Sequence, residues 1–402
     1  MNLLSFCKKE IVIIIIALLI TLSSITGFVR LSSFTYYLGI GLFAFFMLLN
    51  VSQIRVHSKY IVLFLLACFL SILFNSPPEY FMAWQRFWIY LFILLIMSPV
   101  FVSNTINYFR IRLLNIQLLL CAVLSIGSFF AFFLGINFFI RNNEVLEIRS
   151  GSFSGLLNHS MVLGPIAGIS TIYVMSLIFN DNLKKYRKYL IVGMICCLGA
   201  TLLSASRMAI VSTLFGCVVS LFCYYKENIY KYLKKIIVII VLSVTTFPIW
   251  GGLTDFVMEK QNNNIKSGSM LHSRGSKIEA RLSEFGDSPI FGIGFSTVNS
   301  KYDMVNKVTG QVEPGSSWLA VLSMTGILGL FPFLSIIIVY FKKSFKLKNK
   351  YYSMLFTGIL VFFIFHMIAE GYILSPGNFI NLFFWLLLGT IYAVDYKEKY
   401  NN

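Results

Sequence analysis

The sequence predicts an all-α integral membrane protein with about 12 transmembrane helices and one large extracytoplasmic loop that contains a short amphipathic helix. Of the 402 residues, 57% are hydrophobic and only 12% are charged, and the mean hydropathy is +0.79. Soluble globular domains carry about a quarter charged residues. The composition therefore excludes a soluble protein and indicates a chain that crosses the membrane many times.

Apolar segments of membrane-spanning length recur along the whole chain. About 17 to 25 apolar residues are needed to cross the hydrocarbon core. The twelve segments that we assign are residues 11–28, 34–51, 60–74, 87–102, 113–136, 158–179, 190–206, 208–224, 236–252, 317–340, 353–373 and 378–394. The first follows Lys8 and Lys9 as a signal peptide would, but with so many later spans we expect the chain to keep it as a span.

The positive charges test this division, because Lys and Arg accumulate in cytoplasmic loops. With the N-terminus inside, the predicted cytoplasmic segments hold 21 Lys and Arg residues. The short outer loops hold five, which are Arg30, Arg86, Arg141, Arg149 and Arg207. Both termini are therefore predicted to be cytoplasmic. The net charge of +17 needs no nucleic acid as a partner, since the basic residues lie in short loops between apolar runs.

The longest polar interval divides the chain into three parts. Predicted helices 1–9 occupy residues 1–252, the large extracytoplasmic loop residues 253–316, and predicted helices 10–12 with a cytoplasmic tail residues 317–402. Within the loop, Ser276 and Glu279 have the spacing of a capping box. Three apolar residues then share one helical face, namely Ile278, Leu282 and Phe285. The helix is expected to end at the turn residues Gly286 and Pro289. We expect an amphipathic helix that lies on the membrane surface or caps the helix bundle.

Neither a cofactor nor a metal site is predicted. The seven cysteines lie in or beside apolar segments, without a CxxC motif or metal-ligand spacing. No glycine-rich nucleotide-binding loop occurs on the predicted cytoplasmic side. A reaction would have to use a pre-activated substrate that the membrane delivers.

Three arginines on the predicted outer side stand in motifs. Arg149 opens an Arg…Gly…Asn element, Arg207 ends a Ser-x-Ser-Arg turn, and Arg274 precedes Pro-x-x-Gly-x-Gly in the large loop. Trp318-Leu and, further on, Gly-Ile-x-Gly at 326–329 follow where the chain returns to the membrane. In this combination residues 145–340 resemble the O-antigen ligase/polymerase superfamily, the Wzy-type polymerases of bacterial surface polysaccharide.

The resemblance implies a metal-independent glycosyltransferase in the bacterial inner membrane. Its substrate would be an oligosaccharide repeat unit on undecaprenyl diphosphate, and its product a longer surface polysaccharide (O-antigen, capsule or exopolysaccharide) made at the extracytoplasmic face. Besides this lipid-linked glycan and membrane lipid, a chain-length regulator and a flippase are partners that the resemblance allows.

The resemblance also implies roles for single residues. Arg149, Arg207 and Arg274 would bind the diphosphate, since guanidinium groups bind phosphate oxygens in a bidentate way and stay charged. Glu313 and Arg274 would be catalytic, with Glu313 as the base for the acceptor hydroxyl. Ligases of the family keep a histidine where this chain has Glu313, and this departure favours the polymerase branch.

Five further residues are candidates for the substrate cavity, namely Asn158, His159, Arg281, His366 and Glu370. Asn158 and His159 follow a glycine-rich turn and could equally cap the next span. Arg281 lies on the polar face of the loop helix, where solvation is the alternative. His366 and Glu370 are four residues apart in the predicted span 353–373, so they share a helical face. Ionisable groups at membrane depth usually face a cavity or a partner, and a His-Glu pair joining helices is the alternative.

Transport is the rival class of function. Twelve spans would also suit a flippase or a secondary transporter of the lipid-linked sugar, but such folds usually show related halves with a site near the midplane. The sequence shows no repeat, and its large polar loop occurs once, late in the chain. This favours an enzyme, within which ligase-type glycan transfer remains an alternative to polymerisation.

Overall fold

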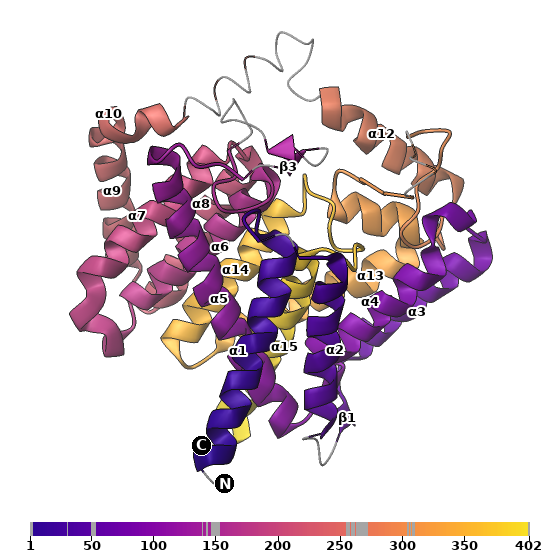
Figure 1. Ribbon diagram of the computed structural model, residues 1–402, viewed down its shortest axis with the longest axis horizontal. Coiled ribbons are helices and arrows are strands. Elements are labelled where there is room, and N and C mark those ends of the chain that lie inside the picture. The colour runs from indigo at the N-terminus through magenta and orange to yellow at the C-terminus, as the bar shows by residue number, and fades with distance from the viewer. Residues whose placement is uncertain are drawn as a thin grey trace. The chain divides into compact units, whose positions relative to one another are not determined.

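Helices make up nearly all of the regular structure in the computed structural model, which describes most of the chain (Figure 1). The described residues are 3–29, 31–49, 54–138, 140, 141, 144, 145, 153–254, 258, 262, 272–303, 305, 307 and 310–400. For residues 3–9, 140, 141, 144, 145, 243, 249, 250 and 272–274 the description covers the backbone alone.

Each of the twelve predicted segments overlaps one longer helix, and residues 236–252 also extend into two short helical elements that follow it. These helices are α1 (Leu3–Ile25), α2 (Ser33–Leu49), α3 (Lys59–Asn75), α4 (Ala83–Met97), α5 (Asn104–Phe133), α6 (Ser160–Ile178), α7 (Arg187–Leu203), α8 (Arg207–Tyr225), α9 (Ile229–Thr245), α13 (Ser317–Lys346), α14 (Lys350–His366) and α15 (Phe379–Tyr400). Within the described residues, seven helices are long and apolar enough to cross a membrane, those at α4, α5, α6, α7, α8, α13 and α15; shorter apolar helices lie within α1, α2, α3 and α14. The chain is thus a multi-pass membrane protein, and its twelve crossings stay a prediction.

Shorter elements connect these helices. They are the 3-10 helices η1 (Glu79–Phe81), η2 (Asp181–Tyr186) and η3 (Gly251–Thr254), the α-helices α10 (Phe247–Trp250) and α12 (His272–Asp287), and the two-residue strands β1 (Arg55–Val56), β2 (Phe101–Val102), β3 (Ile140–Arg141) and β4 (Glu144–Val145). The strands form two antiparallel pairs, β1 with β2 and β3 with β4. With two residues each, these strands do not change the assignment of the protein to the all-α class.

The chain forms two compact units. The first comprises residues 1–41, 115–270 and 344–366. Its helices α8 and α14 approach closely because small residues line the crossing, as is usual between membrane helices. A Cβ added at Gly216 would lie 2.9 Å from the carbonyl oxygen of Gly358, and Ser220 Oγ donates a hydrogen bond to the carbonyl of Met354 at 2.9 Å.

The second unit comprises residues 42–114, 271–343 and 367–402. Its core surrounds α15, where Trp385 is fully buried and donates from Nε1 to Asn381 Oδ1 at 2.9 Å. Arg110 is also fully buried, and its guanidinium donates to the carbonyls of Ile96 and Phe101, each at 2.8 Å. The carbonyl of Ile96 lies in the last turn of α4, where no further helical turn donates to it, and the carbonyl of Phe101 lies in β2. This unit carries the loop helix α12 and residues 317–343 of α13.

Candidate functional site

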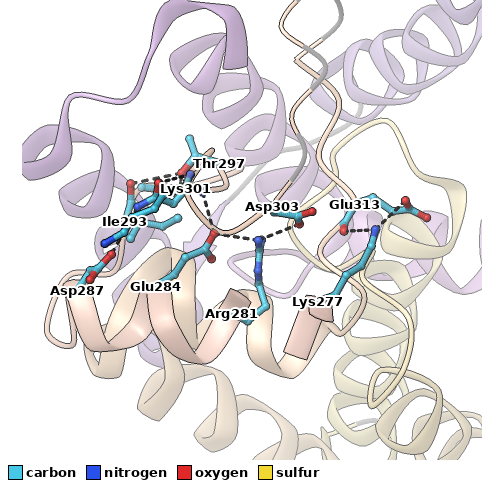
Figure 2. Close-up of polar contacts among 11 residues, drawn as sticks. Lys277, Arg281, Glu284, Asp287, Ile293, Thr297, Lys301, Asp303 and Glu313 are labelled. Atoms are coloured by element: carbon cyan, nitrogen blue, oxygen red, sulfur yellow. Dashed lines mark hydrogen bonds and ion pairs between the residues drawn. The ribbon is translucent and has the colours of Figure 1, made fainter. Parts of the chain in front are cut away.

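Helix α12 carries a row of charged side chains on one face. Lys277, Arg281 and Glu284 are four and three residues apart, so they lie along one side of the helix. Figure 2 shows all three pointing from α12 toward the segment that follows it, which carries Asp303 and Glu313. The helix was expected within this loop, and it presents its charges to the rest of the second unit.

Two details of the expected loop helix are wrong. The helix begins at His272 rather than at Ser276, so Ser276 lies in its interior and does not form a capping box. The apolar side chains Ile278 and Leu282 are 40% and 49% exposed, whereas Arg281 and Glu284 are fully buried. The alternative of a solvated Arg281 is therefore wrong, because its side chain is buried and its charge is compensated inside the protein.

The buried charges form a network of one cation and two anions. Arg281 Nη2 lies 2.8 Å from Glu284 Oε1 and 3.0 Å from Asp303 Oδ2. Glu284 Oε1 also accepts from the backbone N–H of Asn299 at 2.7 Å. Burial raises the pKa of Glu284, while Arg281 and the N–H of Asn299 oppose that shift. The network connects α12 to the segment that follows it.

Part of this network has no partner within the described residues. Arg281 Nε and Nη1 and Glu284 Oε2 are buried and make no hydrogen bond there. Buried donors of a guanidinium are costly to leave unpaired. The network is therefore only partly satisfied by its own side chains.

We expect removal of the Arg281 charge to destabilise the protein, because Glu284 and Asp303 would then lack their cation. Breaking a buried ion pair in this way typically costs about 3 to 5 kcal/mol, so Arg281→Met should lower the melting temperature of the purified protein clearly. Glu279→Gln, an exposed change on the same helix, should change stability by about 0.5 kcal/mol at most. Equal melting temperatures for the two variants would contradict the buried network.

Glu313, in the segment that follows α12, is bound by Lys277 of that helix. Lys277 Nζ donates to Glu313 Oε2 at 2.8 Å and to the Glu313 carbonyl at 2.9 Å. The Glu313 side chain is 75% exposed. The lysine therefore fixes the direction of the carboxylate while leaving most of it accessible to a substrate.

The residues after Glu313 fix the start of α13. The backbone N–H of Ser317 donates to the carbonyls of Met367 and Glu370 at 2.9 and 3.0 Å. Ser317 Oγ donates to the Glu370 carbonyl at 2.6 Å and accepts from the N–H of Tyr372 at 3.0 Å. Glu313 is thus four residues from a rigid anchor.

The Pro-x-x-Gly-x-Gly sequence completes a break in helix α13. Gly326 has φ 63° and ψ −164°, a conformation outside the helical region. On one side of the break, the N–H groups of Ile293 and Gly294 donate to the carbonyls of Ser323 and Met324 at 2.9 and 3.2 Å. On the other side, the carbonyls of Pro289 and Ile290 accept from Ile327 and Leu328 at 2.9 and 3.4 Å. The loop segment replaces the hydrogen bonds that the helix loses.

Two further residues hold this loop, and neither was predicted to belong to the site. Asn75 Nδ2, at the end of α3, donates to the carbonyl of Gly292 at 2.7 Å. Arg86 in α4 donates to Ser296 Oγ at 3.2 Å and to the carbonyl of Gly310 at 2.8 Å. Arg86 was one of the five arginines in the predicted short outer loops, although Lys and Arg otherwise gather in the cytoplasmic loops. This unusual position was the signal in the sequence that could have identified Arg86 as part of the site.

Arg207 is the first residue of α8, in the first unit. Ser206 stands at the N-cap without accepting a side-chain cap hydrogen bond, and the turn before it contains Ala205 with φ 52°. Arg207 is half-buried, and we find no ion pair for its guanidinium among the described residues. A free guanidinium beside the unpaired N–H groups of a helix start suits an anion.

Asn158 and His159 have local structural contacts in the first unit. His159 Nδ1 accepts from the N–H of Met161 at 3.0 Å and so caps α6. Asn158 Nδ2 donates to the carbonyl of Ser24 at 3.2 Å, while its Oδ1 is buried without a partner among the described residues. Both residues hold the start of α6.

The helical pairing expected for His366 and Glu370 is wrong. Helix α14 ends at His366, which is buried, and residues 367–369 form a turn. Glu370 therefore lies beyond the helix, and its carbonyl accepts from Ser317. The apolar sequence continues past the helix end, so hydropathy placed the end of the span too late.

The other two arginines of the expected diphosphate site are Arg149 and Arg274. Arg149 lies outside the described residues. Arg274 lies in the first turn of α12, two turns before Arg281, and only its backbone is described. Lys277, Arg281 and Glu313 are thus brought together in the second unit, whereas Arg207, Asn158 and His159 belong to the first.

No metal-binding cluster occurs in the described ranges, since no three His, Cys, Asp or Glu side chains gather there. The chain was compared with models of known protein families. The family model described as O-antigen ligase matches residues 192–334, from α7 to the middle of α13. No curated protein matches the chain. The matched stretch includes α12, the Pro-x-x-Gly-x-Gly segment, Glu313 and the broken part of α13, and it supports the resemblance found from the motifs.

Proposed function

We propose that this chain, a member of the O-antigen polymerase/ligase superfamily, joins lipid-linked oligosaccharide repeat units into surface polysaccharide. The donor would be a glycan on undecaprenyl diphosphate, and the reaction would take place at the extracytoplasmic face of the bacterial inner membrane. Glycan transfer of the O-antigen type follows from the family match. Polymerisation, the undecaprenyl diphosphate donor and the extracytoplasmic location of the reaction are what we propose beyond this.

The observation that carries the proposal is the setting of Glu313. Its exposed carboxylate is held by Lys277 at 2.8 Å and lies four residues before Ser317, which anchors α13. A general base needs such a fixed direction and access to the substrate hydroxyl. The ligase branch has a histidine at this place, so a carboxylate there supports a related but distinct acceptor reaction.

Arginines supply the countercharge for the leaving group. Arg207 lies at the start of α8 without an ion-pair partner in the described ranges, and Arg274 lies in the first turn of α12. We propose these two residues and Arg149 as the residues that bind the diphosphate. Cations fixed in advance stabilise the negative charge that develops on the departing oxygen.

The proposed step is a single glycosyl transfer. The acceptor hydroxyl oxygen attacks the anomeric carbon of the donor glycan and forms the new glycosidic bond, while the bond from that carbon to the diphosphate oxygen breaks. Glu313 takes the hydroxyl proton. Undecaprenyl diphosphate leaves with the bonding electron pair, its charge balanced by the arginines. No nucleotide is consumed, because the diphosphate linkage already activates the sugar.

Purified protein and lipid-linked repeat units provide the test, in buffer with a chelator and without nucleotide. Elongated lipid-linked products are expected. Movement of the lipid across the bilayer without a new glycosidic bond would reject the proposal in favour of transport.

The matching family, O-antigen ligase, favours one second candidate, ligase-type transfer of finished glycan. In the same assay, a ligase would leave the repeat units unextended and would transfer the glycan to a lipid or protein acceptor when that acceptor is added. The two candidates are therefore separated by the product formed without an added acceptor.

We expect Arg207→Ala to reduce polymer formation by about 100-fold or more, since lost electrostatic stabilisation of this kind costs about 3 kcal/mol. The measurement is the rate of product formation by equal amounts of purified protein. Arg187→Ala is the matched control, because Arg187 is an exposed arginine at the start of α7 in the same unit. Activity of Arg207→Ala equal to that of the control would remove Arg207 from the site.

A further inference from the structure

A polar pocket of about 280 Å³ lies in the second unit, apart from the loop that carries Glu313. Its walls include Arg55 of β1 and His57 just after this strand, Ser103 just before α5 and Asn107 in its first turn, and Tyr392 of α15. Residue 57 precedes α3, whereas Asn75 at the other end of α3 contacts the loop residue Gly292. The pocket and the loop therefore lie at opposite ends of this helix.

The lining of the pocket favours an anion. It includes Arg55 and no acidic side chain. Asp395 is the acidic group whose charge acts on His57, and it is bound by Lys399 at 2.9 Å and by Lys343 at 3.7 Å. Burial, followed by the charge of Lys343, lowers the pKa of His57, so at pH 7 its ring is neutral and the cationic charge of the lining comes from Arg55.

The start of α5 adds donors to the same pocket. The first backbone N–H groups of a helix have no intrahelical partner and attract phosphate. Ser103 Oγ accepts from the N–H of Ile106 at 3.1 Å, and Thr105 also lines the pocket. The backbone N–H of Thr105, which lies one residue before Ile106 in the first turn of α5, has no carbonyl within the helix to which it could donate.

Asn107 gives a second, independent sign of a ligand. Its side chain is 6% exposed, and it lines the pocket. Its Oδ1 is buried and has no hydrogen-bond partner among the described residues. A buried carboxamide oxygen without a donor is costly, so a ligand with a hydroxyl group would satisfy it.

Apolar side chains line this pocket or adjoin it, and Val56 is one of the lining residues. Ile54 and Val56 flank Arg55 and are 46% and 68% exposed. A phosphate with an attached acyl chain would use both surfaces at once, whereas a free phosphate would use only the polar one. The pocket is built from predicted cytoplasmic loops and the C-terminal helix, which places it at the inner leaflet.

We propose that this pocket binds the phosphodiester headgroup of an anionic, hydroxyl-bearing lipid such as phosphatidylglycerol. Arg55 and the start of α5 hold the phosphate, and Asn107 accepts from a headgroup hydroxyl. This site is independent of glycan transfer, and its test reads binding rather than activity.

The experiment measures binding of short-chain phosphatidylglycerol to the purified full chain by native mass spectrometry. We expect Arg55→Glu to weaken binding at least about tenfold, which corresponds to about 1.4 kcal/mol. Lys59→Glu is the matched control, since Lys59 is an exposed basic residue four positions away that does not line the pocket. It makes the same charge change and should retain binding.

Two ligand arms separate the sources of phosphate. Phosphatidylcholine, which has a phosphodiester but no net charge and no hydroxyl in its headgroup, should bind at least about tenfold more weakly than phosphatidylglycerol. Inorganic phosphate should not compete at concentrations at which the lipid saturates. Equal loss in Arg55→Glu and Lys59→Glu, equal binding of the two lipids, or full competition by inorganic phosphate would each overturn the proposal.

Discussion

Gly326→Ala should prevent the protein from reaching a stable folded state. At φ 63° and ψ −164° the residue occupies a backbone region that is open almost only to glycine. An added Cβ would also clash with the carbonyl oxygen of Ile290, which is backbone and cannot rotate away. Strain and clash together should cost more than about 4 kcal/mol, beyond the range of ordinary substitutions. The measurement is the yield and melting temperature of the detergent-purified protein.

Gly275→Ala is the matched control for this prediction. Gly275 lies inside α12, and an added Cβ there would meet nothing within 4 Å. Alanine is favoured over glycine inside helices, so the control should be stabilised by about 0.5 to 1 kcal/mol. If Gly326→Ala folded as well as Gly275→Ala, the break in α13 and its contact with Ile290 would be wrong.

Glu313→Gln should lower the rate of glycan transfer by about 10²- to 10⁴-fold, the usual contribution of a general base. Glutamine has nearly the same shape and can still accept the hydrogen bond from Lys277, but it cannot take up the proton of the acceptor hydroxyl. Since the side chain is 75% exposed, the melting temperature should be unchanged. The measurement is the initial rate of elongation with purified lipid-linked repeat units.

Two controls separate proton transfer from simple positioning. Glu313→Asp keeps a carboxylate and should retain part of the activity, whereas Glu313→Gln should not. Glu279→Gln makes the same chemical change at an exposed position of α12 and should be fully active. Similar rates for Glu313→Asp and Glu313→Gln would assign Glu313 a structural role and would leave the acceptor without its proposed base.

The helices could be predicted from the sequence because their apolar length is itself the physical requirement for crossing a membrane. Where apolar residues continue past a helix end, as after His366, hydropathy gives no stop signal, and the expected pairing of His366 with Glu370 failed for this reason. The break at Gly326 was not predicted either. Glycine occurs often in membrane helices, and only the loop segment at residues 289–294 makes the break favourable.

The site was predicted only in part. Sequence motifs selected Glu313 and the loop helix, but the partner of Glu313, Lys277, lies 36 residues earlier in the chain. The buried position of Arg281 depends on Asp303, 22 residues later. A helical pattern of charged and apolar residues shows which residues share a face, but it does not show which face is covered. For α12 the covered face is the charged one, because carboxylates and a backbone N–H are available to compensate it.

The order of synthesis suits the broken helix α13. Its missing hydrogen bonds are supplied by residues 289–294, which leave the ribosome before any residue of α13 does. The complementary segment is therefore already present when the second half of the helix enters the lipid, so the exposed carbonyls and N–H groups can be paired at once. If residues 289–294 followed α13 in the chain, the nascent helix would enter the bilayer before they were synthesised. Four backbone groups at the break would then be unpaired in lipid, each at a cost of several kcal/mol.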